Sequence, residues 1–195
     1  MKFNPRLFSS MCIVDTCAVW NMLSSRLINQ AAIQAKIHFC ITPFVLHECF
    51  AKRRVSSAVQ QEQQKQLMSR FNSERARGRF TLQGCSINDL AAVSEAAPGK
   101  LGAGELSCIA VAYSIQSMAF MTDDNAAKKY ARDKLNLRVE STPRLYGYLQ
   151  YHRHLGDSDH SKVIEEHEAF EQRPLTKFFK ETLDQAMHYR LMENL

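Results

Sequence analysis

Three aspartates follow short apolar runs of the sequence, where strands of a buried sheet are expected. Asp15 directly follows the apolar residues 11–14, and Asp123 and Asp124 follow the apolar run 118–122. Short runs that are apolar throughout are typical of strands covered on both faces of a parallel sheet. Ligands of such open sheets bind at the carboxyl ends of the strands. We therefore expect these carboxylates to meet at one edge of the sheet.

Two glutamates are expected at the same edge. Thr42-Pro43 predicts a helix start, with Thr as N-cap and Pro at the first helical position, which places Glu48 in the second turn. Glu105 follows Gly102-Ala-Gly104 and begins an apolar helix that leads to the run 118–122. Acids from four distant parts of the chain thus converge if the sheet is parallel.

Such a cluster of acids favours metal-dependent chemistry. Carboxylates a few ångströms apart repel one another and their pKa values rise. A hard divalent cation such as Mg²⁺ or Mn²⁺ removes this cost, and it leaves coordination positions for water and for phosphate oxygens. One or two such ions can activate water and stabilise the leaving oxygen of a phosphodiester, so that no Ser, Cys or His nucleophile is required.

Each acid also has a plainer interpretation. Asp15 and the pair Asp123-Asp124 can be helix caps, because Asp is a preferred N-cap residue. Glu105 can be a first-turn residue favoured by the helix dipole, and Glu48 can be an ordinary surface residue. The metal interpretation therefore depends on the four positions together, not on any one of them.

The elements around the acids alternate in type. Further short strands are expected at residues 38–41, 80–82 and 137–140, with helices between them, and this alternation from 11 to 140 predicts a doubly wound α/β sheet with right-handed crossovers. After Pro143 only helices are expected.

The sequence resembles the PIN-domain family of metal-dependent nucleases over roughly residues 10–142. The matching segments are Ile13-Val-Asp15-Thr16, Thr42-Pro-Phe-Val-Leu-His-Glu48, Leu101-Gly-Ala-Gly-Glu105 with the apolar helix that follows, and Phe120-Met-Thr-Asp123-Asp124-Asn-Ala-Ala. The resemblance implies a three-layer α/β/α fold with a central parallel sheet of four or five strands. It also implies cleavage of RNA, less often DNA, with Mg²⁺ or Mn²⁺.

The resemblance assigns roles to single residues. Asp15, Glu48, Glu105 and Asp123 resemble the catalytic, metal-binding acids, and Asp124 resembles a fifth that holds metal through water. Thr16, Thr122 and, more weakly, Asn125 resemble residues that orient the carboxylates.

Many small bacterial members of this family are toxins that a cognate antitoxin holds inactive. The expected division is a nuclease domain at 1–143, with a basic helical insertion near 51–80, and a C-terminal helical extension at 144–195. The insertion and the extension both depart from the compact toxin pattern. A metal-dependent endoribonuclease is the first hypothesis, either as the toxin of a toxin–antitoxin pair or as a defence effector, with RNA as substrate and an antitoxin or other protein as partner.

Basic charge is concentrated in the insertion. The whole chain has 25 Lys and Arg against 20 Asp and Glu, a net charge of +5. One interpretation is a solvated helix face. The other, which we favour, is a surface that tracks phosphates and leads RNA to the acids, because an acidic site must recruit a polyanion past its own field. Its basic residues are Lys52, Arg53, Arg54, Lys65, Arg70, Arg75, Arg77 and Arg79.

The extension and the cysteines have simple interpretations. An apolar stripe that includes Phe179 and Ala186 predicts a helix that packs on the body, with a homodimer or partner interface as the alternative. Five of the seven histidines follow residue 143 and are expected at the surface. The six cysteines form no zinc-binding pattern, and we expect them to be reduced and mostly buried in a cytoplasmic protein without a membrane span.

Other functions remain open. The second hypothesis is a non-catalytic PIN-like module that binds nucleic acid or protein, and a DNA-directed nuclease is a further alternative. A phosphatase of the haloacid-dehalogenase type needs an acid two residues after Asp15, where the chain has Cys17. A dinucleotide-binding domain needs a glycine-rich turn after the first strand, and Asp15-Thr-Cys-Ala has none.

Overall fold

A five-stranded parallel sheet forms the centre of the protein in the computed structural model, which describes residues 3–51, 58–170 and 174–193. The strand order is β3-β2-β1-β4-β5, and every pair is parallel. The strands are β1 Met11–Val14, β2 His38–Ile41, β3 Phe80–Leu82, β4 Ala119–Met121 and β5 Val139–Glu140. The predicted α/β/α fold with a parallel sheet of four or five strands is confirmed.

The register of β1 and β4 brings the first and last acids together. Val14 pairs with Met121, and the backbone N–H of Asp15 donates to the carbonyl of Met121 over 3.1 Å. Both strands therefore end at the same level of the sheet. Asp15 follows one strand directly, and Asp123 lies two residues beyond the end of the other.

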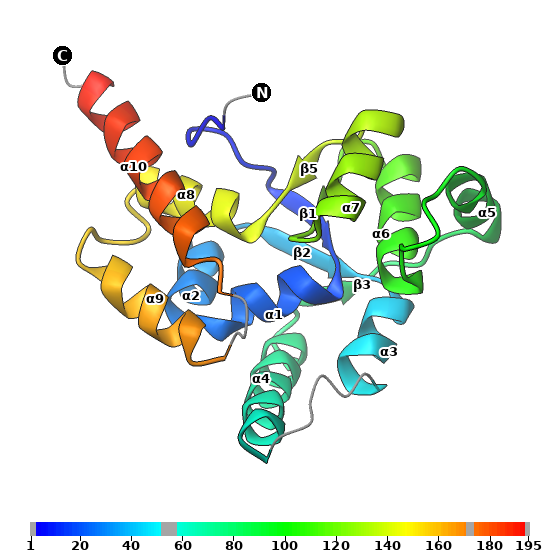
Figure 1. The fold of residues 1–195 in the computed structure, drawn as a ribbon, viewed down its shortest axis with the longest axis horizontal. Helices are drawn as coiled ribbons and strands as arrows, with labels where there is room; N and C mark the ends of the chain where they lie inside the picture. Colours follow the sequence, from blue (N-terminus) through cyan, green and yellow to red (C-terminus); the bar gives the residue numbers. More distant parts are fainter. Residues whose placement is uncertain (1–2, 52–57, 171–173, 194–195) are drawn as a thin grey trace.

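Helices cover the two faces of the sheet (Figure 1). One layer is built around α1, which contacts α2, α4, α8 and α9, and in the other layer α6 contacts α3 and α5 and packs on β1 and β4. The bounds are α1 Thr16–Ser24, α2 Arg26–Gln34, α3 Pro43–Ala51, α4 Ala58–Ala76, α5 Ile87–Glu95, α6 Ala103–Ser114, α7 Asn125–Lys129, a π-helical turn Tyr130–Lys134, α8 Thr142–Tyr151, α9 Asp159–Glu168 and α10 Thr176–Glu193.

The core contains large apolar side chains from both layers. Trp20 packs edge-on against Phe71 of α4, and Phe71 in turn contacts Phe80 of β3. All six cysteines are free, and Cys12, Cys40, Cys49 and Cys108 are buried, as the sequence predicts. They occupy the core as small apolar groups.

Helix α4 packs more closely than its sequence suggests. Its narrow apolar stripe predicts a helix that projects from the body. Its first turn does expose Val59, which is 70% accessible, but Leu67 and Phe71 are buried against α1 and the sheet. The helix is therefore anchored by its C-terminal half, and its other end extends outward in Figure 1.

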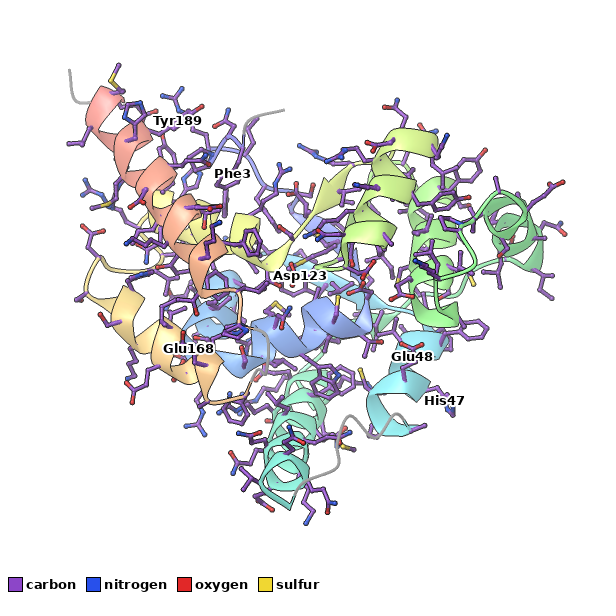
Figure 2. The ribbon with its side chains drawn as sticks, in the orientation of Figure 1. Phe3, His47, Glu48, Asp123, Glu168 and Tyr189 are labelled. Atoms are coloured by element: carbon purple, nitrogen blue, oxygen red, sulfur yellow. The ribbon has the colours of Figure 1, made fainter. Side chains whose placement is uncertain are left out.

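The helices after residue 143 pack on the body. Phe179 and Ala186 of α10 are fully buried, and α10 lies along α8. Arg6 near the N-terminus pairs with Glu193 at 2.8 Å and lies over the ring of Tyr189, so the first residues hold the far end of α10 (Figure 2). The predicted intramolecular packing of the stripe is thus observed, while Phe178 remains half exposed.

Within the described ranges, no helix has the length and apolar character needed to cross a membrane.

Candidate active site

Asp15 has a buried carboxylate whose two oxygens differ in their hydrogen bonds. Its Oδ1 accepts the backbone N–H of Ala18 at 2.9 Å, which makes Asp15 the N-cap of α1 as the plainer interpretation requires. Its Oδ2 is buried and has no hydrogen-bond partner among the described residues, and Asp15 as a whole is 1% exposed. Burial raises the pKa of Asp15 to about 7, against the lowering effect of the nearby Thr122 hydroxyl. Such a carboxylate is costly to ionise without a cation.

Asp123 is held by donors from two other elements. The backbone N–H of Thr142 donates to its Oδ1 at 3.0 Å, and the Thr142 hydroxyl donates to Oδ2 at 2.6 Å. The side-chain amide of Asn21 donates to Oδ2 at 2.9 Å, and the Lys128 ammonium lies 4.0 Å from Oδ1. The orientation of this carboxylate is therefore fixed by α1 and by the start of α8.

Cys17 lies between the two aspartates. Its thiol donates to Asp15 Oδ1 at 3.1 Å, and its sulfur accepts the backbone N–H of Asp123 at 3.3 Å. Burial, and then the charges of Asp15 and Asp123, raise the pKa of this thiol. Cys17 thus links the acids as a neutral group.

Glu48 and Glu105 form the second pair, beside two glycines. Figure 2 shows Glu48 on the side of α3 that faces α6, whereas His47 points outward. A Cβ on Gly104 would lie 2.6 Å from Glu48 Oε2, and a Cβ on Gly102 would lie 2.8 Å from Glu105 Oε2 and 3.7 Å from Glu48 Oε1. The lack of side chains on these two glycines leaves room for both carboxylates.

The residues predicted to support the acids differ in what they contact. Thr16 donates its hydroxyl to Glu48 Oε2 at 2.5 Å, and so joins the two pairs. The Thr122 hydroxyl accepts the N–H of Asp124 at 3.0 Å. Asp124 is the N-cap of α7, where it accepts the N–H of Ala127, and Asn125 is exposed in the first turn of that helix.

Sequence reasoning missed two residues that hold Asp123. Thr142 lies two residues beyond the end of β5. Residues that follow parallel strands meet at the carboxyl edge of the sheet, so the argument that selects Asp15 also selects Thr142. Asn21 gives no such signal, because an Asn inside an apolar helix has no motif of its own. The contact with Asp123 becomes visible only when α1 is placed against the end of β4.

A family model described as PIN domain matches residues 24–186, well over half of the chain. This chain belongs to the PIN-domain family. Neither the comparison with curated proteins nor that with solved structures found a significant match. The match continues through most of the segment after 143 and includes Glu48, Glu105 and Asp123, whereas Asp15 precedes it.

PIN domains are generally nucleases that typically use divalent metal ions. The residues at the edge of the sheet can therefore be compared with the ligands that such an ion requires. No group of three or more His, Cys, Asp or Glu side chains within the described ranges is arranged to hold a metal ion. The four acids instead form two pairs, Asp15 with Asp123 and Glu48 with Glu105. Glu48 accepts a hydrogen bond from Thr16, Glu105 from the N–H of Gly102, and Asp123 from Thr142. The Oδ2 of Asp15 fits a cation, because it is a buried carboxylate oxygen without a hydrogen-bond partner among the described residues. The glycines at 102 and 104 leave space that the carboxylates of Glu48 and Glu105 occupy.

The described basic residues of the predicted insertion are largely paired within the protein. Arg70 donates to the carbonyls of Leu23 and Ser24 at 2.7 and 2.8 Å, and so caps the end of α1. The other described members also have partners: Arg77 and Arg79 pair with Glu74, Lys65 pairs with Glu62, and Arg75 lies over the ring of Phe71. The remaining predicted members, Lys52, Arg53 and Arg54, lie outside the described residues.

Proposed function

We propose that this PIN domain is a metal-dependent endoribonuclease that hydrolyses RNA phosphodiester bonds with Mg²⁺ or Mn²⁺. The proposed ligands are Asp15, Glu48, Glu105 and Asp123, with Asp124 as an outer ligand. The observation that carries the proposal is the buried Oδ2 of Asp15, which has no hydrogen-bond partner in the described parts of the chain and lies at the edge of the sheet where Asp123 is also held. Family membership supports the nuclease class.

In this proposal the protein's own groups bind and orient. When bound, the cation supplies a water of lowered pKa and neutralises charge on the phosphate. Asp15 contributes an oxygen that has no other partner among the described residues, and Thr142 and Asn21 keep Asp123 turned toward the same edge. Thr16 holds Glu48 beside the glycines. No side-chain nucleophile is required, because water is the attacking group.

The deciding experiment measures cleavage of a fluorescent single-stranded RNA with Mg²⁺, with Mn²⁺ and with EDTA. We expect cleavage with either ion and none in EDTA. The control is the Asp15→Asn variant purified by the same procedure, which reveals any contaminating ribonuclease. Equal cleavage in EDTA, or equal cleavage by the variant, would contradict the metal mechanism.

The same assay distinguishes the alternatives. Cleavage of single-stranded DNA of the same sequence at an equal or higher rate would favour a DNA-directed nuclease. RNA binding without cleavage under any metal condition would favour the non-catalytic module.

A further inference from the structure

A chain of buried polar groups connects Asp123 to the C-terminal helices. Asn21 is only 9% exposed, and its side-chain amide donates to Asp123 Oδ2 at 2.9 Å. Its backbone carbonyl accepts the hydroxyl of Ser24 at 2.6 Å, one turn further along α1. Ser24 is fully buried and lies 2.7 Å from Nδ1 of His167 on α9.

The hydrogen bonds of His167 fix its tautomer. Its Nε2 accepts the backbone N–H of Leu175 at 2.9 Å, so Nε2 carries no proton. Nδ1 of the neutral ring then carries the proton and donates to Ser24, whose own proton goes to Asn21. Each step has one donor and one acceptor.

The sequence predicts a surface position for His167. This prediction is wrong, because the folded protein buries the ring completely between Ser24 and the backbone of Leu175.

The extension also contacts the junction between α1 and α2, where Ser25 is the C-cap of α1 and the N-cap of α2. Glu166, next to His167, accepts the Ser25 hydroxyl at 2.8 Å and the N–H of Leu27 at 3.4 Å. Helix α1 carries Asp15 at its N-cap and Asn21 in its second half. A shift of this helix would therefore move both groups at the site.

We propose that Asn21 is a positioning residue for Asp123, and that His167 keeps it in place through Ser24, so that the C-terminal helices complete the active site. The proposal rests on the function proposed above. Residues that hydrogen-bond a metal-binding side chain without touching the metal typically contribute about 10–100-fold to metal affinity or activity. A role confined to capping α1 would lower stability alone.

The first test changes Asn21. Asn21→Leu keeps the size of the side chain and removes the amide donor. We expect kcat on single-stranded RNA to fall about 10–100-fold with KM nearly unchanged, and the affinity for Mn²⁺, measured by electron paramagnetic resonance, to fall in parallel. The matched control is Asn72→Leu on the exposed face of α4, which should change neither value.

The second test changes the distant groups. Ser24→Ala removes a single hydroxyl, and His167→Leu removes the ring. Both should lower Mn²⁺ affinity and kcat, though less than Asn21→Leu, whereas His188→Leu at an exposed site should not. Ser24→Ala remains informative if His167→Leu fails to fold.

The outcomes separate this proposal from the proposed function. If the wild-type protein neither binds Mn²⁺ nor cleaves RNA, the proposed function fails, and the positioning role fails with it. If the wild type is active and Asn21→Leu matches it in kcat and in Mn²⁺ affinity, only the positioning role is wrong. If Asn21→Leu loses both while Ser24→Ala and a folded His167→Leu retain both, Asn21 positions Asp123 without help from the extension, and that part of the proposal is overturned.

Discussion

The carboxyl edge of the sheet and helix α4 carry opposite charge, and they differ in how that charge is neutralised. At the sheet edge, Asp15 is buried with an oxygen that no donor of the described residues reaches. On α4, carbonyls of α1 accept hydrogen bonds from the guanidinium of Arg70, and Glu74 pairs with Arg77 and Arg79 from the turn that follows the helix. One region buries a carboxylate oxygen that has no hydrogen-bond partner among the described residues, and the other pairs its charge internally.

The difference shows why charge counts are a poor guide to a binding surface. The basic segment looks like the polyanion site in the sequence, yet much of its described charge serves to anchor the helix. Exposed ion pairs such as Lys65 with Glu62 contribute little to stability and are screened by salt. The acids are less conspicuous in the composition. Burying the carboxylate of Asp15 costs free energy, however, and a bound cation would offset that cost.

The largest effect is expected for Asp15→Asn, which removes the charge that defines the acidic region. RNA cleavage should fall by about a thousandfold, because a directly binding carboxylate is removed. The exposed Asp184→Asn is the control of equal charge change and should leave the rate unchanged. A variant at position 15 with near wild-type turnover would remove Asp15 from the site.

The same variant also tests how much the burial of the Asp15 charge lowers the stability of the protein. The pKa of Asp15 is about 7 in the folded protein, against an ordinary value of 3.8. Its contribution to stability is therefore complete below pH 3.8 and is lost as the pH rises through 7. In EDTA at pH 8, Asp15→Asn should unfold at the same or a higher temperature, with a gain limited to about 4 kcal/mol. A clear loss of stability at pH 8 would argue against strain at this position.

His167 should give a pH dependence of the opposite sign. Burial lowers its pKa to about 4, against an ordinary value of 6.5, so the folded state excludes a proton that the unfolded chain binds. The stability is present above pH 6.5 and is lost as the pH falls toward 4, by up to about 3 kcal/mol. Urea unfolding from pH 8 to 4 should show a shallower loss for His167→Gln than for the wild type.

The control for this measurement is the exposed His188→Gln, which should keep the wild-type slope. Because Asp15 and His167 act in opposite directions between pH 4 and 6.5, each contribution appears in the difference between variant and wild type. Equal slopes for the two histidine variants would mean that His167 is protonated without cost.

How far the sequence predicts these regions depends on the range of the interactions. The strands and the acids that follow them are encoded locally, by apolar runs that end in Asp, and the parallel topology then brings Asp15 and Asp123 together. The roles of Asn21 and His167 depend on which helices pack together. An Asn in an apolar helix and a His in a polar tail have no local pattern that reports a partner far away in the chain.

Gly104→Ala tests the second pair of acids with a smaller expected effect. The new Cβ would lie 2.6 Å from Glu48 Oε2, so the carboxylate must move away from its place beside Glu105. We expect about a tenfold lower kcat. Stability should not fall much, because Ala favours a helix over Gly by about 1 kcal/mol. Gly99→Ala, which meets nothing within 4 Å, is the control. Unchanged activity at position 104 would place Glu48 outside the site.

The smallest effect is expected on α4, where Lys65 and Arg75 are the described basic residues that pair with neither a buried carboxylate nor a carbonyl of α1. Changing both to Gln should raise KM for RNA a few-fold and leave kcat unchanged, since the acids remain in place. The slope of log K against log salt should fall by about 0.7 for each phosphate that the protein no longer neutralises.

The control is the double variant Lys177→Gln and Lys180→Gln on α10, which removes the same charge at another exposed site. Equal KM and equal slope for both double variants would make this part of α4 a solvated surface. The path of the RNA would then be sought along Lys128, Lys129 and Arg132, where the ammonium of Lys128 lies 4.0 Å from the carboxylate of Asp123.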